Sequence, residues 1–165
     1  MLGVLEADML KIAQAETADD LATVGALFRE YQALLGVDLS FQDFDAEVSQ
    51  LPGAYAPPGG RLLLASYDGA PVGCVALRAA GPSRAEMKRL FVRPSARGLG
   101  VGRALVALVL DEARAVGYSE VVLDTLPTMT QAQGLYEEFG FRDIAPYRPN
   151  PIVGTRYLAK SLREA

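Results

Sequence analysis

The stretch "VRPSARGLGVGRAL", which runs from Val92 to Leu105, decides how the rest of the chain is interpreted. Gly98, Gly100 and Gly102 alternate there between a predicted strand and a predicted helix. The first N–H groups of a helix lack partners within that helix and lie at the positive end of its dipole. Glycines leave these N–H groups uncovered, so phosphate groups can reach them. The stretch therefore predicts a loop that binds phosphates.

Two familiar phosphate-binding loops fit this spacing poorly. A P-loop needs Lys and then Ser or Thr after its last glycine, whereas Gly102 is followed by Arg103 and Ala104. In a dinucleotide fingerprint that begins at Gly98, the third glycine would fall on Arg103. Asp124 nevertheless occupies the place of that fingerprint's ribose-binding acid. A dinucleotide-binding domain therefore stays open as an alternative, as does a glycine-rich turn without a ligand.

Apolar periodicity and turn residues divide the chain into strands and helices. Leu21, Val24 and Phe28 recur at helical spacing, for example, and Asp68-Gly69 is typical of a hairpin turn. The order β-α-α-β-β-β-α-β-α-β-β predicts an α/β fold with a mixed, twisted sheet of about seven strands and about four helices. Residues 1–165 are expected to form a single domain. The strands are expected over residues 9–14, 61–67, 70–80, 85–92, 120–125, 141–147 and 155–162, and the helices over 17–35, 40–51, 100–116 and 130–139.

Composition narrows the classes of function. The chain carries 16 basic and 20 acidic residues, a net charge of -4, so general attraction to nucleic acid or anionic membrane is not expected. It has no histidine and one cysteine, Cys74, which disfavours a metal site, a His-activated nucleophile and an internal disulfide. Glu6 and Asp8 replace a basic leader, and no apolar run approaches the roughly 20 residues that span a bilayer. A soluble, cytoplasmic protein is expected.

The spacing Arg97-x-x-Gly100-x-Gly102 matches the acetyl-CoA pyrophosphate loop of the GNAT superfamily of N-acyltransferases. "EMKRLFVRPSARGLGVGRAL" resembles that family's fourth strand, loop and third helix. "AQGLYEEFGF", Ala132 to Phe141, resembles its helix before the sixth strand. The resemblance extends over about residues 10–162, and it implies the GNAT fold with acetyl-CoA as the cosubstrate.

The same resemblance implies a set of cofactor-binding residues. Amides from Arg97 through Arg103 would hold the pyrophosphate, and the strand Leu90 to Val92 would offer backbone groups to the pantetheine and the thioester. The implied residues are Leu90, Phe91, Val92, Arg97, Gly98, Leu99, Gly100, Val101, Gly102 and Arg103.

Charge and strand alternation add two expectations for this region. Basic residues gather in an otherwise acidic chain, as a polyanionic cofactor would require, at positions Lys88, Arg89, Arg93, Arg97 and Arg103. Regular alternation would place one set of side chains on a single face of the strand, namely Glu86, Lys88, Leu90 and Val92.

Two residues are implied to be catalytic. Glu86 stands where the histone-acetylating branch of the family places its general base. It lies about 13 Å from Leu90 along an extended strand of roughly 3.3 Å per residue, so we expect it to act through ordered water. Tyr136 matches the tyrosine that protonates the leaving sulfur or donates a hydrogen bond to it. Met129 stands where many members have Asn, so that residue's hydrogen bond to the cofactor does not carry over.

Acceptor selectivity is expected from segments that the motifs do not cover. The candidates there are Tyr31, Tyr147, Arg148 and Asn150. Arg148 could hold a substrate carboxylate through two hydrogen bonds, which favours an amino-acid-like amine. A polyamine or cationic antibiotic is favoured instead by three acidic residues, Asp38, Asp43 and Asp45.

Together these features predict an N-acetyltransferase that moves an acetyl group from acetyl-CoA to a small-molecule primary amine by direct transfer in a ternary complex. The alternative from another class is a non-catalytic acyl-CoA-binding sensor or partner module. The sequence leaves open whether the acyl group is acetyl or longer, and whether the protein is a monomer or a homodimer.

Overall fold

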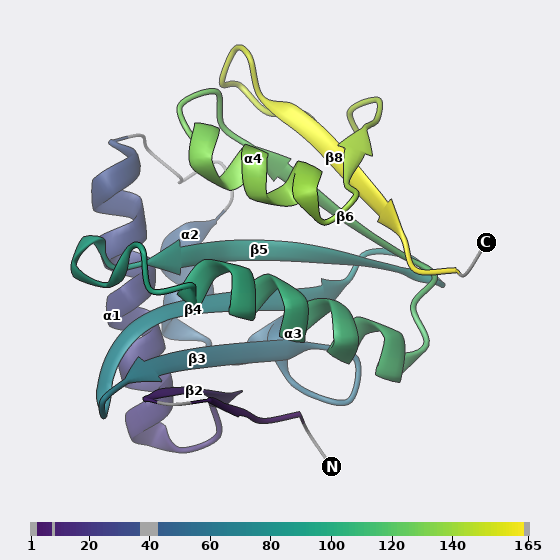
Figure 1. The fold of residues 1–165 in the computed structure, drawn as a ribbon. Coiled ribbons are helices and arrows are strands. Elements are labelled where there is room, and N and C mark those ends of the chain that lie inside the picture. Colours follow the sequence, from purple (N-terminus) through teal and green to yellow (C-terminus); the bar gives the residue numbers. More distant parts are fainter. Residues whose placement is uncertain (1–2, 8, 37–42, 164–165) are drawn as a thin grey trace.

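The computed structural model describes residues 3–7, 9–36 and 43–163, which build one mixed sheet flanked by helices (Figure 1). Eight strands take the order β1-β2-β3-β4-β5-β6-β8-β7. The strands are β1 Leu5–Ala7, β2 Leu10–Gln14, β3 Arg61–Tyr67, β4 Ala70–Ala79, β5 Arg84–Val92, β6 Glu120–Thr125, β7 Arg142–Asp143 and β8 Arg156–Ser161. The helices are α1 Ala18–Leu35, α2 Phe44–Ser49, α3 Val101–Val116 and α4 Thr130–Glu138, with short 3-10 turns at Gly53–Tyr55 and Pro94–Ala96.

The predicted α/β fold is confirmed, with small differences at the two ends of the sheet. The structure adds a short first strand, β1, which pairs with β2. The strand expected over residues 141–147 is reduced to β7, Arg142–Asp143. Within the described residues, no helix combines the length and apolar character needed to cross a membrane.

Helix ends follow local sequence signals. At the start of α1, the Thr17 side chain accepts a hydrogen bond from the Asp20 N–H, and the Asp20 carboxylate accepts one from the Thr17 N–H. Gly36 ends α1 with φ of 67°, and Gly117 ends α3 with φ of 107°. Both glycines take the left-handed conformation that other residues adopt only with strain. The predicted ends of these two helices are therefore confirmed.

The sheet separates two apolar cores. Helices α3 and α4 cover one face, and α1 and α2 cover the other (Figure 1). Leu105 and Val109 of α3 are fully buried on the first face. Leu27 and Phe28 of α1 are fully buried on the second. Because both faces are covered, a side chain can reach an open site only where the sheet itself opens.

The sheet opens between β5 and β6, the parallel pair near its centre. Their register is Arg84 with Glu120, Ala85 with Val121 and Glu86 with Val122. Both strands continue, to Val92 and to Thr125, but the pairing stops after Glu86. The facing edges of the two strands beyond that point are therefore free to meet a ligand.

A β-bulge interrupts β5 just past this point. Cys74 of β4 pairs with Phe91, but Ala76 pairs with Lys88, so β5 holds one extra residue in between. Arg89, in this interval, has φ of 60°, which is rare for a residue with a side chain. Met87 and Leu90 consequently pack on the α3 face, while Phe91 belongs to the α1 face.

The bulge overturns one expectation from regular alternation. Glu86, Lys88, Leu90 and Val92 were predicted to share one face, and this is wrong. Leu90 and Val92 pack against the core under α3. The extra residue exchanges the faces of all side chains that follow it.

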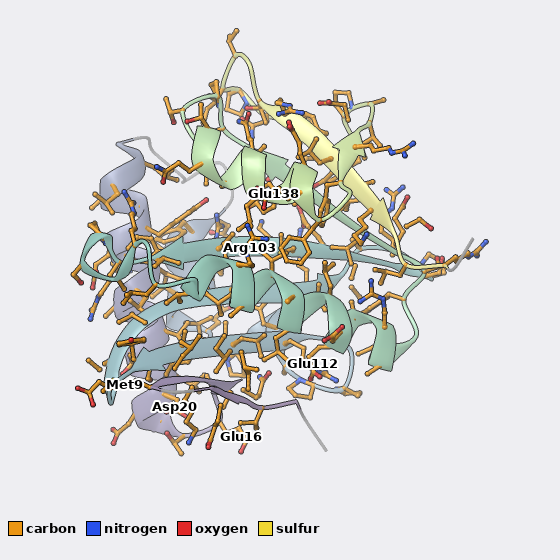
Figure 2. The ribbon with its side chains drawn as sticks, in the orientation of Figure 1. Met9, Glu16, Asp20, Arg103, Glu112 and Glu138 are labelled. Atoms are coloured by element: carbon orange, nitrogen blue, oxygen red, sulfur yellow. The ribbon has the colours of Figure 1, made fainter. Side chains whose placement is uncertain are left out.

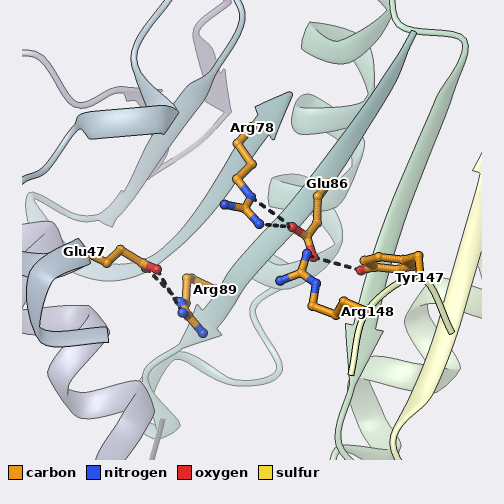
Figure 3. Close-up of polar contacts among 6 residues, drawn as sticks. All are labelled: Glu47, Arg78, Glu86, Arg89, Tyr147 and Arg148. Atoms are coloured by element: carbon orange, nitrogen blue, oxygen red, sulfur yellow. Dashed lines mark hydrogen bonds and ion pairs between the residues drawn. The ribbon is translucent and has the colours of Figure 1, made fainter. Parts of the chain in front are cut away.

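A buried ion pair holds the bulge in place. Arg89 donates from Nε to Glu47 Oε2 at 2.9 Å and from its terminal nitrogen to Glu47 Oε1 at 3.0 Å (Figure 3). Its guanidinium also lies 5.1 Å from the centre of the Phe44 ring and 6.0 Å from that of Tyr31. The Cys74 thiol donates to the Arg89 carbonyl at 3.5 Å. The strained residue is thus fixed from α1, α2 and β4 together.

Glu47→Ala should strongly lower stability, because it leaves the Arg89 guanidinium buried without its counter-charge. Breaking a buried pair from one side costs about 3–5 kcal/mol, whereas an exposed pair contributes about 0–1 kcal/mol. Glu138→Ala is the matched control, since Glu138 pairs with Arg103 and both side chains are more than half exposed. Urea unfolding measures both variants, and equal losses of stability would contradict this account of the bulge.

Candidate functional site

An open groove of about 590 Å³ lies where β5 ends beside the glycine-rich loop. Its walls come from the end of β5, the loop and first turn of α3, the start of α4 and the last turns of α1. Most of the predicted cofactor residues line it: Leu90, Phe91, Val92, Arg97, Gly98, Gly100, Val101 and Gly102. Leu99 and the Arg103 side chain are exposed outside this lining.

The loop presents unpaired N–H groups to the groove. Gly98 and Gly100 have φ of 87° and 78°, so the chain turns here in a left-handed conformation that glycine adopts freely. Gly100 is the N-cap of α3. Among the described residues, no acceptor meets the N–H groups of Val101, Gly102 and Arg103. Such a helix start can bind an anion.

Only part of the predicted cluster of basic side chains lies at this loop. The Arg97 side chain lines the groove. Arg93 instead forms an ion pair with Glu30 of α1, at 2.6 Å. Arg103 forms one with Glu138 of α4, outside the groove (Figure 2). The fold therefore engages Arg93 and Arg103 in ion pairs, and the glycine-rich loop retains one basic residue at the groove, Arg97, together with its amides.

The wall that faces the loop comes from the start of α4, where the motifs pointed to Met129 but not to its polar neighbours. Thr128, Met129, Thr130 and Gln131 line the groove there. Hydroxyl and amide side chains beside Met129 offer hydrogen bonds that the thioether, a weak acceptor, does not. Their only signal in the sequence is a polar run just before a predicted helix.

A small pocket of about 30 Å³ continues the groove into the gap between β5 and β6. It has room for about two water molecules. Tyr31, Leu35, Leu90 and Met129 line both spaces. The remaining walls of the small pocket are Met87, Lys88, Arg89, Asp124, Leu126, Tyr136 and Asn150.

Tyr136 is placed at this junction by α4. Its ring is buried against Phe141, with ring centres 5.7 Å apart. Burial raises the pKa of its phenol above the usual value, so the hydroxyl stays protonated at neutral pH. No described residue accepts or donates a hydrogen bond at this hydroxyl. The phenol is therefore available to donate to a group in the pocket.

Glu86 lies at the last position where β5 pairs with β6, and it is fully buried. One oxygen accepts from Arg78 at 2.9 to 3.0 Å, and the other accepts from Arg148 and from the Tyr147 hydroxyl at 2.8 Å (Figure 3). Burial raises the pKa of this carboxyl, but Lys88, Arg148 and Tyr147 together outweigh burial and hold the pKa below its usual value. Glu86 is thus a carboxylate whose two oxygens already accept hydrogen bonds.

The four predicted acceptor residues separate into two pairs. Tyr31 and Asn150 line the small pocket. Tyr147 and Arg148 instead contact Glu86, and the Arg148 guanidinium lies 5.1 Å from the centre of the Tyr147 ring. The Arg148 side chain remains about one quarter exposed.

Three charged residues line the small pocket, and none of them was predicted to act on the acceptor: Lys88, Arg89 and Asp124. Lys88 was considered only for the cofactor, and Asp124 only as a ribose-binding acid beside the glycine loop. Asp124 does not line the groove at that loop but the pocket between β5 and β6. Its Oδ2 is buried without a hydrogen-bond partner in the described part of the chain.

The acids proposed to attract a polyamine do not gather at this site. Asp45 is exposed and pairs with Arg29 at 2.5 Å, and Asp43 is exposed before α2. Asp38 lies outside the described residues. Within the described ranges, no group of three or more His, Cys, Asp or Glu side chains is arranged to hold a metal ion.

Comparison with known proteins agrees with the geometry. The profile of the Acetyltransferase (GNAT) family matches residues 25–141. An uncharacterized N-acetyltransferase of Schizosaccharomyces pombe is 40% identical over 151 residues, which covers 90% of this chain and 93% of that protein. A human N-acetylaspartate synthetase is 41% identical over 87 residues, which covers 52% of this chain but only 29% of that protein.

A solved structure shares the fold throughout. The crystal structure of an acetyltransferase from Streptococcus agalactiae matches with a TM-score of 0.79 at 24% identity, and the match covers 94% of this chain and all of that one. Family profile, close relative and fold agree with the loop, the groove and the parting of β5 from β6. The chain belongs to the GNAT family of acetyltransferases.

Proposed function

We propose that this protein transfers an acetyl group from acetyl-CoA to a small-molecule primary amine, directly and within a ternary complex. The observation that carries the proposal is the continuity of the two spaces: a groove edged by unpaired loop amides leads into a small polar pocket in the gap between β5 and β6. A long anionic cosubstrate suits the groove, and an amine head group suits the pocket.

The groove offers what each part of acetyl-CoA needs. The N–H groups of the loop and the Arg97 guanidinium would hold the phosphates. The edge of β5 from Leu90 to Val92, which β6 no longer pairs, would offer backbone hydrogen bonds to the pantetheine. When bound, the cosubstrate supplies an activated acetyl group as a thioester.

Tyr136 would act on the sulfur side of the reaction. Its phenol lines the small pocket next to Leu90, where the groove and the pocket meet. Because burial raises the pKa of this phenol, a hydrogen bond to the departing sulfur is favoured over complete proton transfer. Such a bond would stabilise the charge that develops on sulfur.

Glu86 would position other residues rather than act as a direct base. Its oxygens accept from Arg78, Arg148 and Tyr147, and its lowered pKa weakens it as a proton acceptor. We therefore assign it the task of holding Arg148 against β5. The competing role, which the sequence suggested, is that of a base acting through ordered water. The pH dependence of kcat/KM distinguishes the two roles.

Direct transfer is supported by the absence of a cysteine nucleophile from the described lining of the two spaces. Cys74 lines neither space, and it is fully buried. Burial raises the pKa of its thiol, which leaves it a poor nucleophile. Tyr31 and Leu90 line both spaces, so the two substrates would meet without an acyl-enzyme.

A non-catalytic acyl-CoA-binding module is the competing function, because the groove alone would suit it. The polar pocket favours catalysis, since binding acyl-CoA does not require it. The human relative named N-acetylaspartate synthetase indicates by its name an amino acid as acceptor, and its match supports a small amine here.

A thiol-release assay with acetyl-CoA and a broad panel of primary amines tests the proposal, and Tyr136→Phe refines it. The variant keeps the ring and removes one hydroxyl, so kcat should fall about tenfold or more while acetyl-CoA affinity and the thermal midpoint stay nearly unchanged. Acetyl-CoA binding without thiol release for any amine would favour the binding module. If Tyr136→Phe lost stability but kept full turnover, Tyr136 would have a packing role only.

Gly102→Val should abolish or severely weaken acetyl-CoA binding. A Cβ at Gly102 would lie 3.6 Å from Val92 and 3.7 Å from Leu135, so the protein tolerates it, but the branched side chain would cover the loop amides. Gly134→Val is the control, because a Cβ there meets open space in α4. Calorimetry measures the affinity and circular dichroism the fold. Unchanged affinity would refute the placement of the phosphates.

Glu86→Gln should destabilise the fold most near neutral pH. The folded-state pKa of Glu86 is lowered, so its stabilising contribution is present above the usual pKa of about 4.3 and disappears as pH falls through the folded value. The difference between wild type and variant, about 3–5 kcal/mol at pH 7 for a buried pair, should therefore shrink in acid. Glu120→Gln, which alters the partly exposed pair with Arg84, should show a small difference throughout.

The same variant separates positioning from base action. A positioning role predicts a loss of kcat/KM that does not depend on pH. A base predicts a defect that shrinks toward pH 9–10, where an alkyl amine of pKa about 10.4 loses its own proton.

A further inference from the structure

The face of β5 that carries Glu86 holds more positive charge than it neutralises. Arg78 and Arg148 pair with Glu86, and Lys88 lies two residues further along the strand. Lys88 is more than nine-tenths buried, yet no described residue forms an ion pair or hydrogen bond with its ammonium. Three cations thus surround one carboxylate. A buried excess of charge is unfavourable unless an anion completes it.

The opposite strand holds an unmatched negative charge. Asp124 lines the same small pocket as Lys88, and its Oδ2 is buried with no partner in the described part of the chain. The carboxylate is close enough to contribute to the raised pKa values of Tyr31 and Tyr136, after the larger effect of burial. It therefore faces the junction at which the two substrates would meet.

Strand register places these two charges opposite each other. Glu86 and Val122 are the last paired residues, and Lys88 and Asp124 each lie two positions beyond them. Residues two apart on a strand share a face, so both side chains point to the same side of the sheet across the widening gap. No ion pair joins them, although both line one pocket. The gap is therefore bordered by an ammonium and a carboxylate for which the described part of the chain supplies no partner.

We propose that this gap selects a free α-amino acid as the acceptor, with the amine of the substrate on Asp124 and its carboxylate on Lys88. The inference rests on the proposed function and narrows its acceptor from any primary amine to one that carries a carboxylate on the same carbon. Room for about two water-sized groups suits an ammonium and the edge of a carboxylate. The side chain of the substrate would extend toward the groove.

Each charged residue has a separate task. Lys88 binds, and burial together with Arg89 lowers its pKa to about 8, so it is still mostly protonated at pH 7. Asp124 accepts a hydrogen bond from the substrate ammonium and receives one proton from it. The freed nitrogen lone pair forms the C–N bond to the acetyl carbon as the C–S bond breaks, and the second proton that the nitrogen loses balances the one that the departing sulfur takes up. Asp124 then releases its proton to solvent. Overall, an ammonium and a thioester yield an amide, a thiol and one released proton.

The deciding experiment compares each of the twenty amino acids with the amine that lacks its α-carboxylate, such as leucine with isoamylamine. Thiol release should show kcat/KM at least tenfold higher for the preferred amino acid than for its matched amine. Lys88→Met should erase this preference by raising KM for the amino acid, and Lys88→Arg should keep it. Lys11→Met, on the exposed side of β2, is the control that should change nothing.

Asp124→Asn tests the other half of the pocket. It should lower kcat/KM for amino acids and simple amines alike, at least tenfold, with acetyl-CoA affinity unchanged. Equal turnover of matched pairs, unaffected by Lys88→Met, would overturn the acceptor assignment and leave the acetyltransferase function standing. If no amine is turned over, calorimetry of CoA-loaded protein still decides: leucine and the other amino acids must bind more tightly than their matched amines, and Lys88→Met must remove the difference.

Discussion

The pair between Arg89 and Glu47 is the interaction on which the rest of the site depends. Arg89 occupies a left-handed conformation in the middle of β5, where regular pairing would be favoured without it. Two hydrogen bonds to α2 and the faces of two aromatic rings hold its guanidinium on the side of α1 and α2. The bulge then directs Leu90 toward α3 and leaves the following backbone edge beside the groove. A local strain is thus maintained by contacts distant in sequence.

The bulge acts together with the separation of β5 from β6. A sheet covered on both faces normally has no room for a ligand between its strands, and this mixed sheet gains room because the parallel pairing of β5 with β6 ends at Glu86 and Val122. The two strands then present their edges and their side chains to the same gap. Backbone borders the side of that gap proposed for the cosubstrate, and charges border the side proposed for the acceptor, so one opening suits two chemically different molecules.

Local motifs predicted the parts of the site that depend on a few adjacent residues. The alternating glycines placed the start of α3, and the run around Tyr136 placed α4, because each signal lies within one turn or helix. The partners of Glu86 could not be predicted, since Arg78, Tyr147 and Arg148 come from separate segments. Neither could the bulge, which depends on pairing between β4 and β5. Exact alternation was the natural expectation, and it failed where tertiary contacts overrode it.

The basic residues show why composition alone misassigned charge. Arg93 and Arg103 follow the pattern of a phosphate site in sequence, yet each forms an ion pair with a glutamate of another segment, Glu30 of α1 and Glu138 of α4. Lys88, which stands in the same run, has no such partner among the described residues and lines the small pocket instead of the groove. The nearby carboxylate of Glu86 already accepts hydrogen bonds from Arg78 and Arg148. It thereby holds Arg148, and with it the loop beyond β7, against β5. In the proposed reaction, β5 therefore positions both substrates: its bulge sets the edge for the cosubstrate, and Glu86, the last residue that pairs with β6, sets the charged wall for the acceptor.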